Sequence, residues 1–324
     1  ASITTSGYYT ADRWQASVNA IGTWTNSVES DAPTGSGFRN SFKMLCTTAD
    51  ASPAAGDQLM IQQVLEGQDV QRIAKGTVSA KELVLSFWVK SNKTGTYIVE
   101  AWDQDNSRQI SKTYTINTSG TWEQKSISYP ADATGVFDND NAASLILRWW
   151  LGAGTTYTSG TLNSSSWATA VNANRAPGLL NLADTVSNYW QVTGVQLEAG
   201  PVATPFEFEP FETTLRKCQR YYFQLNGAGG VSIGVGLSTT TTSAYVNVPF
   251  PVQMRANPSS ITFNALNLSD TSTYDKAVSS IPNFYGGPLS ALVSIIHAAS
   301  GVQYRPCHLR LANTSGYLAV SAEL

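Results

Sequence analysis

The fold is decided by the stretch Asn188-Tyr-Trp-Gln-Val-Thr-Gly-Val-Gln-Leu-Glu-Ala-Gly-Pro-Val-Ala-Thr-Pro-Phe-Glu207, which is followed by Cys218-Gln-Arg-Tyr-Tyr222. Residues 189–197 are rich in aromatic and β-branched side chains, which favours a strand, and Gly200-Pro201 favours a turn after it. The acidic residues beyond the turn favour a short connector. No residue of the stretch points to catalysis. The pattern therefore predicts the last strand of one β-rich domain and the passage into a second.

Similar short runs lie on both sides of this stretch, separated by clusters of Gly, Asn, Asp and Ser. Closely spaced runs of this kind predict an antiparallel sandwich or jelly roll and disfavour a βαβ arrangement. The predicted strands upstream are residues 83–89, 96–102, 111–116, 122–129 and 144–151. Those downstream are residues 231–237, 244–250, 260–268, 289–298, 304–311 and 317–324, of which 289–298 is also compatible with a buried helix.

Helical patterns are scarce, and the best of them covers residues 207–221, where Arg216, Lys217 and Arg220 suit the last turn of a helix. We therefore predict an all-β protein. Residues 1–205 form an N-terminal jelly-roll β-sandwich, residues 206–220 a connector with a short helix, and residues 221–324 a smaller C-terminal β-sandwich.

The composition excludes several classes of partner. Charged residues make up only 13% of the chain and the net charge is −3, without a basic run, so nucleic acid is not expected to bind. No apolar stretch is long enough to span a bilayer, and the first residues lack the pattern of a signal peptide. The chain begins at Ala1 without Met, and we expect it to be processed or to be a fragment of something longer.

The cysteines predict neither a metal site nor a disulfide framework. Cys46, Cys218 and Cys307 are odd in number and widely separated, and no CxxC spacing occurs. We expect buried reduced thiols, as in a protein that is made in a bacterial cytosol and released by lysis.

Several short motifs together resemble the tail-fibre and virion structural proteins of tailed bacteriophages. They are Tyr8-Tyr-Thr-Ala-Asp-Arg-Trp14, Gln58-Leu-Met-Ile-Gln-Gln63, Glu66-Gly67, Val84-Leu-Ser-Phe-Trp-Val89, Gly120-Thr-Trp122, Gly160-Thr-Leu162, Trp167, Val195-Gln-Leu-Glu-Ala-Gly200, Cys218-Gln-Arg-Tyr221, Val248-Pro-Phe-Pro-Val-Gln-Met-Arg-Ala256 and Ser321-Ala-Glu-Leu324. The resemblance extends over nearly the whole chain. It implies a carbohydrate-binding-module-like jelly roll followed by a smaller β-domain, in a homotrimeric fibre or spike. It identifies no ligand and no binding residue.

The residues give no sign of enzyme chemistry. The two histidines are His297 and His308, and His297 lies in an apolar run, where a core or interface role is expected rather than that of a general base. No GxSxG, HExxH, P-loop or GxGxxG motif occurs. We therefore expect no catalytic residue and no enzyme activity.

Two acidic pairs, Asp103 with Asp105 and Asp138 with Asp140, lie in loops rich in Asn and Gly. Their first interpretation is as turn residues. A structural calcium ion at either pair is the second, because carboxylates and carbonyls suit Ca²⁺, and glycan hydrolysis by paired carboxylates is the third. No other cofactor is expected.

Glycan binding needs aromatic faces beside polar groups. Strand alternation in residues 145–151 places the leucines and Trp149 on one face and Arg148 and Trp150 on the other. If the leucine face is core, Arg148 and Trp150 point outward. We take Trp150, Arg148, Trp167 and Tyr157 as candidate glycan-binding residues, with packing beneath a neighbouring strand or at a subunit contact as the alternative for each.

The predicted function is a non-enzymatic virion component, a fibre or spike with a tail position favoured over a capsid one. Its expected partners are two further copies of itself, other virion proteins and host cell-surface polysaccharide, and its location is the virion, outside the cell after host lysis. The alternatives are a polysaccharide depolymerase that carries a carbohydrate-binding module and a ligand-free capsid decoration protein.

Overall fold

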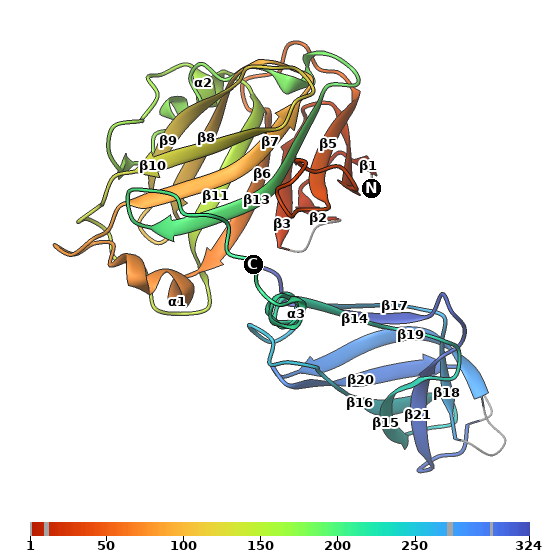
Figure 1. Ribbon diagram of the computed structural model, residues 1–324. Coiled ribbons are helices and arrows are strands. Elements are labelled where there is room, and N and C mark those ends of the chain that lie inside the picture. The colour runs from red at the N-terminus through yellow and green to blue at the C-terminus, as the bar shows by residue number, and fades with distance from the viewer. Residues whose placement is uncertain (1, 10–12, 271–274, 299–300) are drawn as a thin grey trace. The chain divides into compact units, whose positions relative to one another are not determined.

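The computed structural model describes all of the chain except residues 1, 10–12, 271–274 and 299–300. The chain divides into two compact units, Ala1–Phe208 and Glu209–Leu324, and the division falls inside the predicted connector. Strands dominate both units (Figure 1), so the predicted all-β class is confirmed. Among the described residues, no helix is long and apolar enough to cross a membrane.

The first unit is a sandwich of two antiparallel sheets, and the chain crosses repeatedly from one sheet to the other, as in a jelly roll. The six-stranded sheet has the order β1 (Ser2–Ile3), β4 (Thr23–Glu29), β5 (Ser41–Thr48), β13 (Tyr189–Ala199), β7 (Leu83–Ser91) and β10 (Glu123–Tyr129). The seven-stranded sheet has the order β12 (Ala168–Thr169), β9 (Arg108–Ile116), β8 (Gly95–Asp103), β11 (Ala143–Ala153), β6 (Gln58–Glu66), β3 (Trp14–Asn19) and β2 (Gly7–Tyr8).

Among the described residues of this unit, the helices between the strands are short. They are α1 (Gly67–Val70) with the 3₁₀ turn Gln71–Ile73, α2 (Thr155–Thr158), and the 3₁₀ turns Asn172–Asn174 and Leu182–Asp184.

The core between the two sheets is built around aromatic side chains. Trp149 of β11 lies 5.7 Å from Phe87 of β7, ring centre to ring centre, and Phe87 lies 5.2 Å from Tyr114 of β9. Tyr114 in turn stacks on Tyr97 of β8 at 5.5 Å. These rings come from both sheets and are almost fully buried, so they hold the sandwich together by apolar burial and edge-to-face contact.

A second, smaller apolar cluster lies on the other face of the seven-stranded sheet. It is formed by Met60, Ile98, Trp150 and Ala176. Tyr157, Leu162 and Leu179 pack against it from the covering segment, residues 154–179, which follows β11. This segment folds back over the sheet and covers the outward-facing residues of β11.

The second unit differs in detail from the expected β-sandwich. Six of its strands close into a barrel in the order β15 (Ser232–Ser238), β16 (Ser243–Pro249), β20 (Ser290–His297), β19 (Asp275–Gly286), β18 (Leu266–Ser269) and β21 (Pro306–Leu311). A three-stranded sheet of β14 (Tyr222–Asn226), β22 (Tyr317–Ser321) and β17 (Ser260–Asn264) accompanies the barrel. The unit begins with α3 (Phe211–Gln219), and residues 290–297 form a strand rather than a helix.

Glycine explains how β15 curves into the barrel. A Cβ atom on Gly236 would lie 1.9 Å from the Tyr245 carbonyl oxygen of the adjacent β16, and one on Gly234 would lie 2.8 Å from the Asn247 carbonyl oxygen. Only glycine permits backbones to approach this closely. The alternation of glycine with larger residues in this strand therefore favours closure, which removes the exposed edges of the sheet.

Candidate functional site

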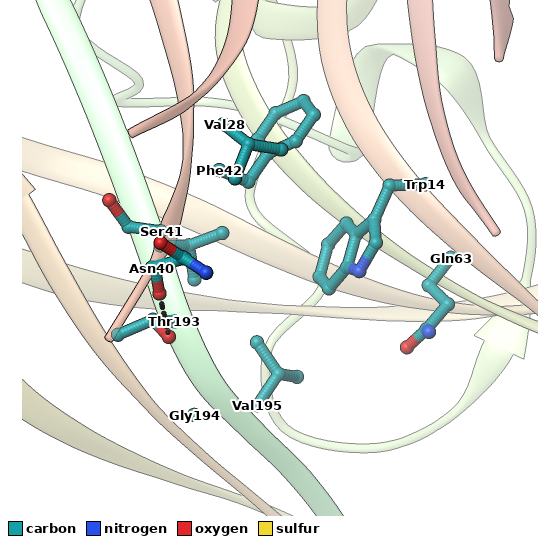
Figure 2. Close-up of a pocket in the computed structure, with 10 residues that line it drawn as sticks. Trp14, Val28, Asn40, Ser41, Phe42, Gln63, Thr193, Gly194 and Val195 are labelled. Atoms are coloured by element: carbon teal, nitrogen blue, oxygen red, sulfur yellow. Dashed lines mark hydrogen bonds between the residues drawn. The ribbon is translucent and has the colours of Figure 1, made fainter. Parts of the chain in front are cut away.

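A pocket of about 280 Å³ opens between the two sheets of the first unit, where β3 and β6 of one sheet approach β4, β5 and β13 of the other (Figure 2). This volume is near the lower end of the range of small-molecule sites, about 300–1,000 Å³. Its lining residues are Trp14, Val28, Asn40, Ser41, Phe42, Gln63, Val192, Thr193, Gly194 and Val195.

The pocket exists because β5 and β13 separate. Their pairing ends at Val192 and Phe42, and the pairing of β13 with β7 is irregular just after Thr193. Gly194 has a φ of 60°, in the left-handed region that disfavours other residues. A Cβ atom on Gly194 would also lie 2.5 Å from the Phe38 ring. The bulge at this glycine changes the course of β13 where its pairing with β5 ends, beside the pocket between the two sheets.

Trp14 provides the aromatic surface of the pocket. Its ring is half-buried, stacked on Phe42 at 6.0 Å between ring centres and tilted against Trp149 at 5.3 Å. The indole is therefore fixed by the core on one side, and part of it faces the pocket.

Two amide side chains, Asn40 and Gln63, lie on either side of Trp14 in the pocket (Figure 2). In the part of the chain that the structure describes, neither amide has a hydrogen-bond partner. The neighbouring hydroxyl groups are engaged, because Thr193 Oγ1 donates to the Asn40 carbonyl oxygen at 2.8 Å and Ser41 Oγ accepts from Gln191 Nε2 at 3.2 Å. The two amides are thus available donors and acceptors beside an aromatic ring.

Three of the four predicted glycan-binding residues, Trp150, Arg148 and Tyr157, lie together on the opposite, outward face of the seven-stranded sheet. The Trp150 and Tyr157 rings are 5.2 Å apart. Trp150 is nevertheless fully buried, because the segment after β11 covers it. Strand alternation gives its direction correctly, but the expectation of an exposed ring for a sugar is wrong.

Arg148 belongs to a charged cluster centred on the buried Glu100. Arg175, which comes from the covering segment, donates to both carboxylate oxygens of Glu100 at 2.8 Å. Arg148 Nη1 lies 3.6 Å from the same carboxylate, and both guanidinium groups lie 4.7 Å from the centre of the Trp102 ring. Burial lowers the pKa of Arg148 to about 10, although Glu100 acts in the opposite direction.

Trp167, the fourth predicted glycan residue, is placed elsewhere. It is nearly buried at the margin of the sandwich core, where its indole nitrogen donates to the Pro130 carbonyl oxygen at 2.9 Å. The Lys75 ammonium lies 5.2 Å from its ring centre. Trp167 therefore packs in the core and shares no surface with the other three candidates.

A lysine lies beside Asp103, at the position where the sequence suggests a calcium ion. The buried Lys75 ammonium lies 2.5 Å from Asp103 Oδ2 and 3.1 Å from Asp132 Oδ2, and it donates to the carbonyl oxygens of Thr134 and Gly135 at 2.9 Å each. A positive charge surrounded by four oxygens already occupies this position. The structure therefore assigns Asp103 to an ion pair rather than to a calcium site.

The remaining acidic candidates act as loop residues. Asp105 Oδ2 accepts from the Asp138 backbone N–H at 3.0 Å, and Asp140 Oδ1 accepts from the Ala142 N–H at 2.9 Å. The Asp140 bond spans two residues and is of the kind that stabilises a turn, whereas the Asp105 bond joins two loops. The described residues contain no group of three or more His, Cys, Asp or Glu side chains that could hold a metal ion.

A hollow of about 440 Å³ in the second unit brings Cys307 and His308 close to Asp270 and Arg305. Asp270 is paired with Arg305 at 2.6 Å. Burial, assisted by the Asp270 charge, raises the pKa of the Cys307 thiol, so the sulfur is a poor nucleophile.

The other histidine, His297, is buried, and its Nδ1 lies 2.7 Å from the Ala298 carbonyl oxygen.

The sequence interpretation missed the pocket at Trp14. The signals were present, since Trp14 and Gln63 both lie in motifs that resemble phage structural proteins. Alternation along the strand could have placed Trp14 with Ala16 on the core face. It could not have shown that Asn40 and Thr193 lie opposite Trp14, because they come from distant parts of the chain. Part of the first motif, residues 10–12, lies outside the described residues.

Neither a family model nor a curated protein sequence matches the chain. Similar solved structures include the enzymatically active domain of tailspike protein 4 from bacteriophage CBA120, at 14% identity and a TM-score of 0.35. That likeness covers 59% of this chain and 19% of the tailspike chain, so this protein spans about a fifth of it.

Carbohydrate-binding modules are also among the similar structures. The family 11 module of Clostridium thermocellum, in complex with a β-1,3-1,4-mixed-linked tetrasaccharide, is 12% identical with a TM-score of 0.32, covering 59% of this chain and 91% of the module. The module TmCBM61, in complex with β-1,4-galactotriose, is 10% identical with a TM-score of 0.30. The likeness covers 57% of this chain and 88% of the module. At these identities and TM-scores the likenesses identify neither a family nor a ligand.

Proposed function

We propose that this protein is a non-catalytic carbohydrate-binding protein and that the Trp14 pocket takes one residue of a neutral glycan. The observation that carries the proposal is the pair of amides, Asn40 and Gln63, without protein partners beside a half-buried indole. A sugar ring has an apolar C–H face that packs on an aromatic ring and hydroxyl groups that both donate and accept. An amide offers both functions as well.

The pocket favours binding over catalysis. Among the ten described residues that line it, none is Asp, Glu, His, Lys, Arg or Cys. Glycoside hydrolysis generally uses two carboxyl groups, one on each side of the bond that is cleaved. Residues of the pocket can orient a sugar but have no group with which to move a proton at neutral pH.

The binding experiment uses affinity electrophoresis through gels that contain neutral polysaccharides, followed by tryptophan fluorescence titration with the corresponding oligosaccharides. We expect at least one neutral glycan to retard the protein, and Asn40→Ala and Gln63→Ala each to weaken binding about tenfold. Gln124→Ala is the matched control, because Gln124 is exposed on β10 without a protein partner among the described residues. Equal binding by all variants would contradict the assignment of the pocket.

The same incubations separate the alternatives. Polysaccharide chains that become shorter over time would show a depolymerase and contradict the non-catalytic proposal. Failure to bind any neutral or host surface glycan would favour a decoration protein without a ligand.

We also propose that the chain works in a virion, as a homotrimeric fibre or spike. The sequence resemblance to phage structural proteins supports this, as does an apolar outer surface on the barrel. Leu237 and Tyr245 are cross-strand neighbours on β15 and β16, Tyr285 and Leu292 are neighbours on β19 and β20, and all four are exposed. Light scattering should give about three times the chain mass of 34.8 kDa, and a monomer at all concentrations would contradict the trimer.

A further inference from the structure

The outward face of the seven-stranded sheet carries a row of polar residues at one register level. Gln15 on β3 pairs with Gln62 on β6, Gln62 with Arg148 on β11, and Arg148 with Glu100 on β8. Adjacent strands are about 4.8 Å apart, so Gln15 and Arg148 are separated by about 10 Å. These residues point away from the aromatic core, since their sequence neighbours Trp14, Ile61 and Trp149 belong to it.

The direction of each hydrogen bond in the row is fixed by Arg148. A guanidinium group can only donate, so the Arg148 Nε bond of 3.0 Å identifies its partner atom on Gln62 as the amide oxygen. Gln62 must then present its NH₂ group to Gln15, whose amide oxygen accepts. The Gln15 NH₂ group is left without a partner among the described residues.

Each side-chain acceptor of the row already has at least one donor. Glu100 accepts from both Arg175 nitrogens and from Trp150 Nε1 at 3.3 Å, in addition to its ion pair with Arg148. One carboxylate faces two guanidinium groups, which leaves a net charge of +1 in the cluster. Arg148 Nη2 has no hydrogen-bond partner within the described parts of the chain. What the row offers to a ligand is donors and positive charge.

The two arginines have different roles. Arg175 uses Nε and Nη2 on Glu100, its guanidinium lies 4.9 Å from the Trp150 ring and 5.6 Å from the Tyr157 ring, and it serves to hold the covering segment on the sheet. Arg148 keeps Nη2 unbonded among the described residues, whereas its Nε bond to Gln62 and its contact with the Trp102 ring fix its position before any ligand arrives.

We infer that this row binds carboxylate groups of an acidic polysaccharide, with Arg148 and Gln15 as the residues that contact it. A carboxylate is an acceptor only, which is what a surface of donors selects. Because the strands that carry the two donors are about 10 Å apart, the donors can reach groups on different sugar residues. A polymer is therefore favoured over a free sugar acid. This inference extends the proposed glycan binding to a second site made of different residues.

The test uses polygalacturonate, its methyl-esterified form and monomeric galacturonate, measured by isothermal titration calorimetry with the whole chain. We expect polygalacturonate to bind, the methyl ester to bind at least tenfold more weakly, the monomer to bind weakest, and added salt to reduce the affinity. The inference would be overturned if polygalacturonate did not bind, or if its methyl ester bound equally well. Either result would count against the inference regardless of whether neutral glycans bind at the Trp14 pocket.

The decisive variant is Gln15→Glu, which keeps the shape and still accepts from Gln62 but replaces the free donor by a negative charge. It should abolish polygalacturonate binding, whereas Arg72→Gln, an exposed change that also lowers the net charge by one, should not. Arg148→Lys should retain part of the binding that Arg148→Gln loses.

Two further measurements distinguish this site from the Trp14 pocket and from a nucleic-acid site. Asn40→Ala and Gln63→Ala should leave polygalacturonate binding intact even where they remove neutral-glycan binding. The assignment to polysaccharide would be overturned if a duplex DNA oligonucleotide competed with polygalacturonate and if the Gln15→Glu variant no longer bound this DNA.

Discussion

Gln62 and Gln63 are neighbours on β6, but their amides lie on opposite faces of the same sheet. Gln62 is half-buried in the outward row, where both ends of its amide are bonded, to Arg148 and to Gln15. Gln63 lines the pocket on the inner side, and its amide has no partner among the described residues. The outer face is thus a charged network with its acceptors satisfied, and the pocket is neutral with its amides unused. The difference shows that neighbours in space, not residue type, decide which glutamine holds the fold and which is available to a ligand.

The largest effect on stability is expected when the outer network loses Glu100, which is its only negative charge. Glu100→Gln leaves two guanidinium groups near each other in a buried site without a carboxylate, which should reduce the free energy of unfolding by about 3–5 kcal/mol. Urea denaturation measures the change, with Glu207→Gln at an exposed position as the control. A loss below about 1 kcal/mol would mean that the cluster contributes little to stability.

On the inner side, Trp14→Ala should cost about 3 kcal/mol, because Trp14 packs against Phe42 and Trp149 in a largely buried site. It should also remove neutral-glycan binding, whereas Trp14→Phe should keep most of the stability and part of the binding. Thermal unfolding and the electrophoresis assay give the two values. Retained glycan binding in a folded Trp14→Ala protein would place the site elsewhere.

The six-stranded sheet supplies a carboxylate for comparison with Glu100. Burial raises the pKa of Glu123, but hydrogen bonds from Lys125, Thr118 and Asn117 outweigh it and lower the pKa to about 2. A carboxyl group whose pKa is lower in the folded state stabilises the protein above its unfolded pKa of about 4.5, and this contribution is lost as the pH falls toward 2.

Glu123→Gln should therefore lower the free energy of unfolding by roughly 2 kcal/mol at pH 6, and the difference from the unmodified protein should shrink between pH 4.5 and pH 2. Urea denaturation across this pH range measures it. A difference that does not change with pH would show that the hydrogen bonds do not depend on the charge of Glu123.

The smallest effects on stability are expected from substitutions of Gln62 and Gln63. Gln62→Ala should cost about 1–2 kcal/mol, since it leaves the Arg148 Nε–H without its acceptor, and should not affect neutral glycans. Gln63→Ala should change stability by less than about 0.5 kcal/mol and weaken neutral-glycan binding. If the two variants behave alike in both assays, the proposed difference between the faces is wrong.

Much of the fold follows from local sequence. The aromatic and β-branched run at residues 189–197 became β13, and the runs at 83–89 and 144–151 became β7 and β11. Alternation also assigned Trp149 and Trp150 to opposite faces of β11 correctly. The apolar run near His297 was predicted as a strand although its pattern also fits a buried helix, and its pairing with β16 and β19 makes it β20.

The candidate sites were less predictable, because their residues meet from distant parts of the chain. Arg175 reaches Glu100 across 75 positions, and Gln191 reaches Ser41 across 150. Asp103 was predicted to lie in a loop and to have the features of a calcium ligand, but it is the buried last residue of β8, and Lys75 lies against it and provides the positive charge.

By itself, the sequence determined that this is a protein of strands with aromatic cores and few charges, because strand propensity and period-two alternation act over a few residues. Only the tertiary structure decided that the second unit closes into a barrel, that the segment after β11 covers Trp150, and that a pocket lies beside Trp14, next to the bulge at Gly194. Burial and hydrogen-bond partners depend on which surfaces meet after the chain has folded. A pattern over a few neighbouring residues cannot predict which surfaces will meet.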